Sequence, residues 1–163
     1  MMIKQRLRTI WYYAERPLLC LATLLVAAGS VAMFAHAGEE LTAEGRKMFQ
    51  VLHEQQGYPM PVSYPEYHIG PTEDMPSSCS RYVACYARGH VWLLAPMLLV
   101  DKQERLTSLL HENVHHLQWE KRGDATNCEQ NYDREVAAYS AQQIYVSENY
   151  RQYIRVHIPP CTP

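Results

Sequence analysis

The sequence has no excess of basic residues. Lys and Arg number 15 against 17 Asp and Glu, which leaves a formal net charge of −2. Residues 1–37 hold four of the basic residues and only one of the acidic ones, so residues 38–163 carry a net charge of −5. A nucleic-acid-binding domain presents a clustered basic face to the phosphates. The charge balance therefore argues against a nucleic-acid partner.

Long apolar stretches are also absent, apart from residues 18–34, which contain no charged side chain. This stretch follows a basic segment over residues 1–16 and precedes Ala35-His36-Ala37, a small-x-small sequence. The three parts together are typical of a secretory signal peptide. We expect cleavage after Ala37 and an exported domain, periplasmic or secreted, over residues 38–163. The alternative is a membrane anchor, because the 17 residues of 18–34 are close to the shortest length that spans a bilayer.

The sequence contains no C-x-x-C pair, which argues against a zinc site built from cysteines. Residues 38–163 hold four cysteines, Cys79, Cys85, Cys128 and Cys161. An even number in a small exported domain favours two disulfides, and four cysteines allow three pairings. We expect Cys79–Cys85, which closes a short loop, and Cys128–Cys161, which ties the C-terminal tail to the region that follows the helix predicted over 102–122.

Residues 38–163 show no internal repeat and no second domain boundary, so they are expected to form one domain with one core. Apolar periodicity and turn residues predict the following elements: a helix over 41–56 that ends at Gly57 and Pro59, a strand near 61–64, a hairpin from 81–86 and 89–94, a helix over 102–122, a helix over 129–148 and an extended tail. The predicted fold class is α+β, with a small sheet and two long C-terminal helices.

The helix predicted over 102–122 carries the motif His111-Glu112-Asn113-Val114-His115. Positions i and i+4 lie on one face of a helix, so both imidazoles can bind one metal ion. Glu112 lies about 100° round the helix, close enough to contact a water on that metal without binding the metal itself. This H-E-x-x-H arrangement is typical of a zinc hydrolase.

A catalytic zinc usually has three protein ligands and an open fourth position. The downstream candidates for the third ligand are Asp124, Glu129, Asp133, Glu135, His116 and His157. We favour Glu135, because it follows His115 by twenty residues on a helix that a short loop would fold back against the first. The alternative is that Glu135 is a surface carboxylate, as most glutamates are. His53, His68, His90 and His157 have no ligand spacing.

The His-Glu-Asn-Val-His motif, with Glu135 in Asp-Arg-Glu-Val-Ala-Ala-Tyr, resembles the gluzincin branch of the zincin-like metallopeptidases. That family has H-E-x-x-H on one helix and a glutamate on the next. The run from Gly89 to Leu93 is similar to the family's edge strand, which lines the substrate cleft, and the likeness covers about residues 81–145. The resemblance implies a minimal zincin-like fold, Zn²⁺ as cofactor, His111, His115 and Glu135 as metal ligands, and Glu112 as general base.

The expected function is that of an exported zinc metallopeptidase. It would act on a peptide or protein substrate with a zinc-activated water and Glu112 as general base. The backbone of residues 89–93 would bind the substrate by strand addition. Tyr139, four residues beyond Glu135, is a candidate catalytic donor to the oxyanion, although a packed core tyrosine is the alternative. Glu129 and Asp133 are candidate hydrogen-bond partners of the ligand histidines.

A second function class is a zinc-bearing binding or structural module of the cell envelope that has no activity. Metal content would not separate it from the peptidase, because both hold zinc. The two classes differ in activity: a peptidase turns over a substrate and loses this activity when Glu112 is replaced by Gln, whereas the module is inactive in both forms.

Overall fold

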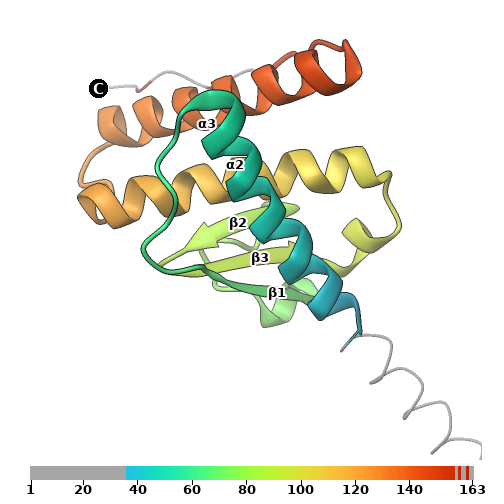
Figure 1. Ribbon diagram of the computed structural model, residues 1–163. Helices are drawn as coiled ribbons and strands as arrows, with labels where there is room; N and C mark the ends of the chain where they lie inside the picture. Colours follow the sequence, from blue (N-terminus) through green and yellow to red (C-terminus); the bar gives the residue numbers. More distant parts are fainter. Residues whose placement is uncertain (1–35, 157, 159–160, 162–163) are drawn as a thin grey trace, which may run out of the picture. The chain divides into compact units, whose positions relative to one another are not determined.

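The computed structural model describes residues 36–156, 158 and 161 (Figure 1). The expected signal peptide falls almost entirely on residues 1–35, outside the described residues. Residues Gly38–Pro163 form one compact unit, and the fold described below is that of this unit. No helix among the described residues is both long and apolar enough to cross a membrane.

The unit has a small mixed sheet and three helices. Its strands are β1 (Glu66–Gly70), β2 (Ala84–Ala87) and β3 (His90–Leu94), and its longest helices are α2 (Lys102–Arg122) and α3 (Cys128–Tyr150). A further helix runs over residues 36–56, and two short 3-10 helices cover Thr72–Asp74 and Ala95–Leu98. The α+β class predicted from the sequence is confirmed.

The sheet has the order β1-β3-β2. β1 is parallel to β3, and β2 is antiparallel to it. The predicted hairpin is confirmed, since β2 and β3 meet at a turn in which Arg88 and Gly89 both have positive φ, 44° and 89°. Two such residues form the tight turn whose twist matches that of the flanking strands.

The strand predicted near residues 61–64 is wrong, because the strand of this region is β1, beginning at Glu66. The N–H groups of Val62 and Ser63 bond instead to the carboxylate of Glu120, at 3.0 and 2.9 Å. The chain therefore runs over the end of α2 before it enters the sheet. Within β1, Tyr67 and Ile69 pack against the core, and His68 between them faces the other way.

The helix predicted over 102–122 is confirmed at both ends as α2. The side chain of Asp101 accepts a hydrogen bond from the Gln103 N–H at 2.9 Å and so caps the first turn. Gly123, with φ 68°, ends the helix. α3 begins one residue before and ends two residues after its predicted bounds, and the helix predicted over 41–56 is already present at residue 36.

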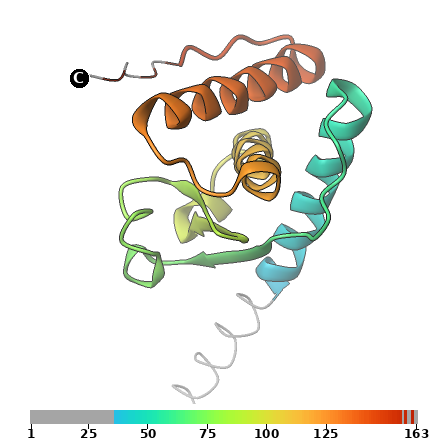
Figure 2. The same ribbon diagram turned by 90° about the vertical axis from the view of Figure 1, so that its left-hand side faces the viewer.

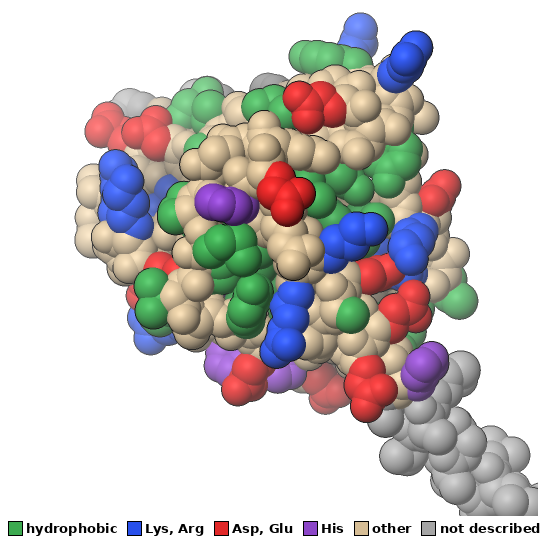
Figure 3. Space-filling view, in the orientation of Figure 1, with side chains coloured by type: hydrophobic (Ala, Val, Ile, Leu, Met, Phe, Trp, Pro, Cys, Tyr) green, Lys and Arg blue, Asp and Glu red, His purple; other side chains and the backbone are tan. Residues whose placement is uncertain are grey.

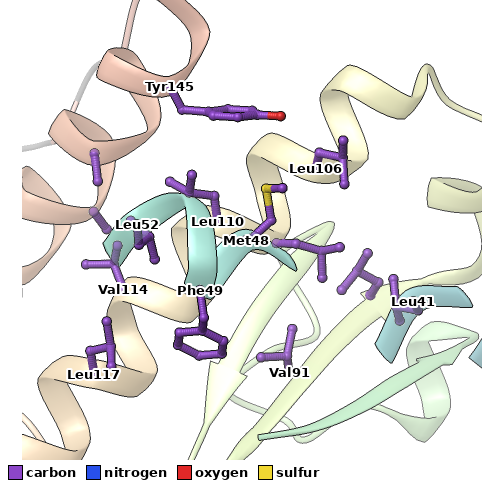
Figure 4. Packing of buried hydrophobic residues seen from close by; sticks show 14 of the residues in the cluster. Leu41, Met48, Phe49, Leu52, Val91, Leu106, Leu110, Val114, Leu117 and Tyr145 are labelled. Carbon is purple, nitrogen blue, oxygen red and sulfur yellow. The ribbon is translucent and has the colours of Figure 1, made fainter. Parts of the chain in front are cut away.

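α2 lies between the sheet and α3, and it contacts both (Figures 1 and 2). Its apolar face meets that of helix 36–56, as Figure 4 shows for Phe49 and Leu52 beside Leu110 and Val114. The core cluster of buried residues draws on every long helix and on β3: Leu41, Met48, Phe49, Leu52, Val91, Leu93, Met97, Leu106, Leu109, Leu110, Val114, Leu117, Ala138, Ala141, Tyr145 and Val146. The helix that carries the motif is thus the central element of the fold.

Both expected disulfides are present. Cys79 pairs with Cys85, and Cys128 pairs with Cys161. The second bond attaches the C-terminal tail to the first residue of α3. Disulfides persist in oxidising compartments, so the pairing indicates an oxidising, exported environment.

Candidate functional site

The structure brings together the three residues that the sequence selected as metal ligands. His111 and His115 lie on one face of α2, with their Nε2 atoms 3.0 Å apart. Glu135 reaches them from α3, with Oε2 at 3.4 Å from Nε2 of His111 and Oε1 at 3.4 Å from Nε2 of His115. These three residues form one of the two His and Glu groups, among the described residues, that could hold a metal ion.

The donor set fits a small divalent cation. A tetrahedral ion with ligands at about 2.1 Å holds neighbouring ligand atoms roughly 3.4 Å apart, and the separations here are 3.0, 3.4 and 3.4 Å. Two imidazole nitrogens and one carboxylate match the donors that zinc and other borderline metals prefer. The arrangement leaves one side open, because all three residues line a cleft of about 1270 Å³.

The charge of Glu135 is set by its histidine neighbours. Burial alone would raise the pKa of this carboxyl, but hydrogen bonds and charge from His111 and His115 outweigh it and lower the pKa to about 2. Conversely, burial would lower the pKa of His115, whereas Glu135 and Glu112 raise it. The site is therefore anionic at neutral pH whenever both imidazoles are neutral, which favours a bound cation.

His115 is oriented by Gln118. The side-chain oxygen of Gln118 lies 3.0 Å from Nδ1 of His115, and its amide nitrogen donates to the Arg134 carbonyl at 3.1 Å. The carbonyl fixes which end of the amide is the donor, so the oxygen faces His115 and accepts from Nδ1. In this tautomer Nε2 of His115 carries the lone pair that a metal ion would bind.

The sequence prediction that Glu129 and Asp133 would orient the ligand histidines is wrong. Both carboxylates are exposed, and the partner of His115 is Gln118. Gln118 stands three residues after His115 on the same helix, and this spacing is the signal that could have found it.

The other candidates for the third ligand have different surroundings. Asp124 pairs with Arg88 at 2.9 Å, and Nε2 of His116 lies 2.6 Å from the Ser63 carbonyl. His116 is buried, so it holds the 61–64 segment against α2. His157 lies outside the described residues.

Glu112 is buried beside the metal-ligand group and lines the same cleft. Burial raises the pKa of its carboxyl. The positive charges of His111 and His115 oppose that rise, and the charge of Glu135 adds to it. The backbone of Tyr86 in β2 also lowers this pKa. Glu112 thus faces β2 from the helix that bears the histidines.

Tyr139 packs against the ring of His111. The two ring centroids are 4.3 Å apart at 60°, and the tyrosine side chain lines the cleft. Nδ1 of His111 is buried and has no hydrogen-bond partner among the described residues, so ring packing on Tyr139 and the contacts of Nε2 with His115 and Glu135 position this imidazole. Burial, followed by the charges of Glu135 and Glu112, raises the pKa of Tyr139, which keeps its hydroxyl protonated.

The edge strand beside the site is β2. The expectation that the backbone of residues 89–93 is free to bind a substrate is therefore wrong. β3 pairs with a strand on each side, so its backbone groups have partners. β2 is at the edge and lines the cleft. The Leu94 N–H donates to the Val83 carbonyl at 2.9 Å. By the alternation of an antiparallel ladder, Ala84 and Tyr86 direct their backbone N–H and C=O groups away from β3, toward the cleft.

Asn113, one of the variable positions of the motif, anchors α2 to the rest of the fold. Its side chain is fully buried. It donates to the Gly45 carbonyl at 2.8 Å and accepts from the Tyr67 hydroxyl at 2.9 Å. These bonds tie the histidine-bearing turn to helix 36–56 and to β1.

Comparisons with protein-family models, with curated proteins and with solved structures give no match to this chain.

Proposed function

We propose that this protein is an exported zinc-dependent hydrolase that cleaves peptide bonds, a minimal protein of the gluzincin type. One observation carries the proposal. His111, His115 and Glu135 converge within ligand distance of one another at a cleft that Glu112 and the free edge of β2 also line. A buried glutamate and a half-buried one beside a histidine pair have no structural need of an open cleft, whereas hydrolysis requires one.

The metal would be held by Nε2 of His111, Nε2 of His115 and the carboxylate of Glu135. A zinc ion in such a site supplies Lewis acidity, which polarises a carbonyl and makes water acidic near neutral pH. The chain's own groups do the remaining work. Gln118 keeps Nδ1 of His115 protonated, and Glu135 stays ionised because its pKa is about 2.

Glu112 would accept the proton of the attacking water at its carboxylate and then pass it to the leaving amine. A general base works best when its pKa is close to the working pH, and burial raises the pKa of Glu112 toward that range. Its burial on α2 and its place in the cleft support this role.

The free edge of β2 would bind the substrate as an added strand. Ala84 and Tyr86 line the cleft, and their backbone groups face away from β3. An extended peptide that pairs with Ala84 would pass directly in front of Glu112. Main-chain pairing is independent of sequence, so side-chain preference would come from the rest of the cleft.

Tyr139 would donate its hydroxyl hydrogen to the oxyanion that forms as the carbonyl is attacked. Its place in the cleft against His111 supports this role, and its raised pKa keeps the donor hydrogen in place. Such donors stabilise charge that exists only in the transition state.

The proposal includes export through a signal peptide cleaved after Ala37. The basic segment, the uncharged stretch over 18–34 and the Ala-His-Ala sequence support it, and the two disulfides agree with an oxidising compartment.

Glu112→Gln tests the proposal. The purified wild type is expected to hold one zinc ion between α2 and α3 and to cleave members of an extended-peptide library, with activity lost on chelation and regained with Zn²⁺. Glu112→Gln is expected to keep that zinc and to lose at least 100-fold in kcat, in line with general-base catalysis. Glu104→Gln is the matched control, because Glu104 is an exposed acid on the same helix, and it should behave as the wild type. A wild type that holds zinc and cleaves no member of the library would overturn the peptidase in favour of a zinc-bearing module without activity.

A further inference from the structure

The outer face of the sheet carries a second cluster of metal-binding side chains. Val91 and Leu93 of β3 are buried in the core, so the alternate residues His90 and Trp92 project from the opposite face. Glu66 and His68 of β1 share that face, because the register pairs Glu66 with His90 and His68 with Trp92. Figure 3 shows histidine and acidic side chains side by side along the lower edge of the molecule, below the sheet.

Three ligand atoms of this cluster lie close together. Nε2 of His68 is 2.9 Å from Nδ1 of His90, and Oε2 of Glu66 is 3.4 Å from His90 and 3.8 Å from His68. These separations bracket the roughly 3.4 Å between ligand atoms of a tetrahedral zinc. The donors are again two imidazole nitrogens and one carboxylate.

We propose that Glu66, His68 and His90 bind a second Zn²⁺ ion on the outer face of the sheet. Nothing in the hydrolase mechanism uses these residues, because α2 and the cleft lie on the other face. The inference is thus independent of the proposed function. The ion would join β1 to β3, because His68 and His90 lie on these two strands, 22 residues apart in the chain.

The sheet positions the three side chains before a metal binds. Glu66 and His90 are direct partners across the parallel strands, and His68 lies two residues along β1, within diagonal reach. The ring of His68 stacks on Trp92, with centroids 4.1 Å apart and planes at 16°. This stacking fixes the imidazole plane and keeps Nε2 directed at His90, so little side-chain freedom is lost when a metal binds.

The contacts within the cluster leave the carboxylate without a close partner. A hydrogen bond joins the two imidazoles at 2.9 Å, whereas Glu66 faces both rings at salt-bridge distances of 3.4 and 3.8 Å. A cation at the centre would contact all three atoms at once. The same kinds of donor, two imidazole nitrogens and a carboxylate, also meet between α2 and α3, at separations of 3.0, 3.4 and 3.4 Å.

The second site would be more exchangeable than the first. The side chain of Glu66 is 73% exposed and that of His90 is 43% exposed, whereas those of His111 and His115 are 9% and 15% exposed. Water competes for exposed ligands, so we infer a weaker site that fills as free zinc rises. Because only the folded sheet brings the three ligands together, the ion would stabilise the fold in proportion to its occupancy.

The experiment is a calorimetric titration of metal-free, disulfide-bonded protein with ZnCl₂. The wild type is expected to bind two ions with distinct affinities. His68→Gln/His90→Gln should abolish the weaker event and leave the tighter one, whereas His111→Gln/His115→Gln should do the reverse. His53→Gln is the control, since His53 is exposed on helix 36–56 and contacts the Tyr58 carbonyl, and it should keep both events.

A wild type that binds a single ion, or a weaker event that survives in His68→Gln/His90→Gln, would overturn the second site. Anomalous diffraction at the zinc edge on wild-type crystals soaked in ZnCl₂ needs no variant. A peak between Glu66, His68 and His90 supports the proposal, and its absence at full occupancy of the His111 site contradicts it. Loss of peptidase activity alone would bear on the first site only, so failure of the two proposals is distinguishable.

Discussion

Gln118 connects His115 to the backbone of the neighbouring helix. Its side-chain oxygen lies 3.0 Å from Nδ1 of His115, and its amide nitrogen donates to the carbonyl of Arg134. Arg134 directly precedes Glu135, so one glutamine positions a histidine of α2 in relation to the carboxylate of α3. The orientation of His115 relative to α3 therefore depends on a side chain that is not itself a candidate metal ligand.

The first prediction concerns Gln118→Ala. Removing the amide frees the His115 ring and its tautomer, so zinc affinity is expected to fall about 10- to 100-fold. The measurement is competition with a zinc chelator of known affinity. Gln103→Ala is the control, because Gln103 lies on the same helix and its side chain bonds only to Gln152. Equal affinities in the two variants would show that Gln118 does not orient the site.

The second prediction concerns Tyr139→Phe and depends on the proposed function. The ring still packs on His111, but the donor to the oxyanion is lost, so kcat is expected to fall about 100-fold with KM and zinc content unchanged. Steady-state kinetics on the best library peptide measures this. Tyr153→Phe, at a side chain that is 78% exposed, should leave kcat unchanged. A fall in zinc content together with kcat would assign Tyr139 a structural role instead.

The third prediction concerns Gly45→Ala. Alanine is the better helix former by about 1 kcal/mol, yet a Cβ at Gly45 would overlap the ring of Tyr67. The Tyr67 hydroxyl is bonded to Asn113 at 2.9 Å, so the ring cannot withdraw without breaking that bond. The free energy of unfolding is therefore expected to fall by about 1 to 3 kcal/mol.

Urea unfolding of the disulfide-bonded protein measures the effect of Gly45→Ala. Gly38→Ala is the matched control, because a Cβ there meets nothing within 4 Å, and it should not lower the free energy of unfolding. If both variants unfold at the wild-type midpoint, the close approach of Tyr67 to helix 36–56 is not rigid.

The fourth prediction concerns the buried pair of Glu44 and Arg105. Two hydrogen bonds of 2.8 and 2.9 Å join them, and Lys102 lies 3.3 Å from the same carboxylate. Burial alone would raise the pKa of Glu44, but Arg105 and Lys102 outweigh it, and the pKa in the folded protein is lowered. The ionised form is thus bound more tightly by the folded state than by the unfolded chain.

Because the pKa is lowered on folding, Glu44 stabilises the protein above its unfolded pKa of about 4.3, and this stability is lost as the pH falls through the folded value. Glu44→Gln is expected to cost about 3 kcal/mol at pH 7, since it leaves Arg105 buried without its main partner. The cost should shrink as the pH approaches 3. Urea unfolding from pH 3 to pH 7 measures it, with Glu54→Gln, at an exposed acid of the same helix, as control. A cost independent of pH would contradict the assignment.

Much of the metal-ligand group follows from local sequence. Asp101 and Gly123 bound α2, because a capping carboxylate and a residue with positive φ act on the turn beside them. Within that helix the four-residue spacing alone places His111 and His115 on one face. Glu112 directly follows His111, so the motif itself places it beside the histidine pair. These three residues could therefore be selected from the sequence alone.

Glu135 needed the packing of α3 on α2. Several downstream acids had comparable spacing, and only the helix crossing brings one of them to 3.4 Å from both imidazoles. Gln118 and the Arg134 carbonyl depend on the same crossing. Local propensity sets where a helix begins and ends, but the angle between two helices is decided by side chains that are distant in the chain.

The order and pairing of the strands could not be predicted from the sequence. The residues of β1 were expected to form a loop, so His68 and His90 had no recognisable spacing, and β3 was taken for the edge strand. Parallel pairing in register with β1 puts β3 in the middle, leaves β2 facing the cleft and sets Glu66 opposite His90. The sequence by itself determined the helix and its histidine pair, whereas it left three pairings of the four cysteines open. Tertiary structure decided that Glu135 lies beside the two histidines, which strand edge is free and which residues cluster on the outer face, because helix packing, strand order and register arise from contacts between segments far apart in the chain.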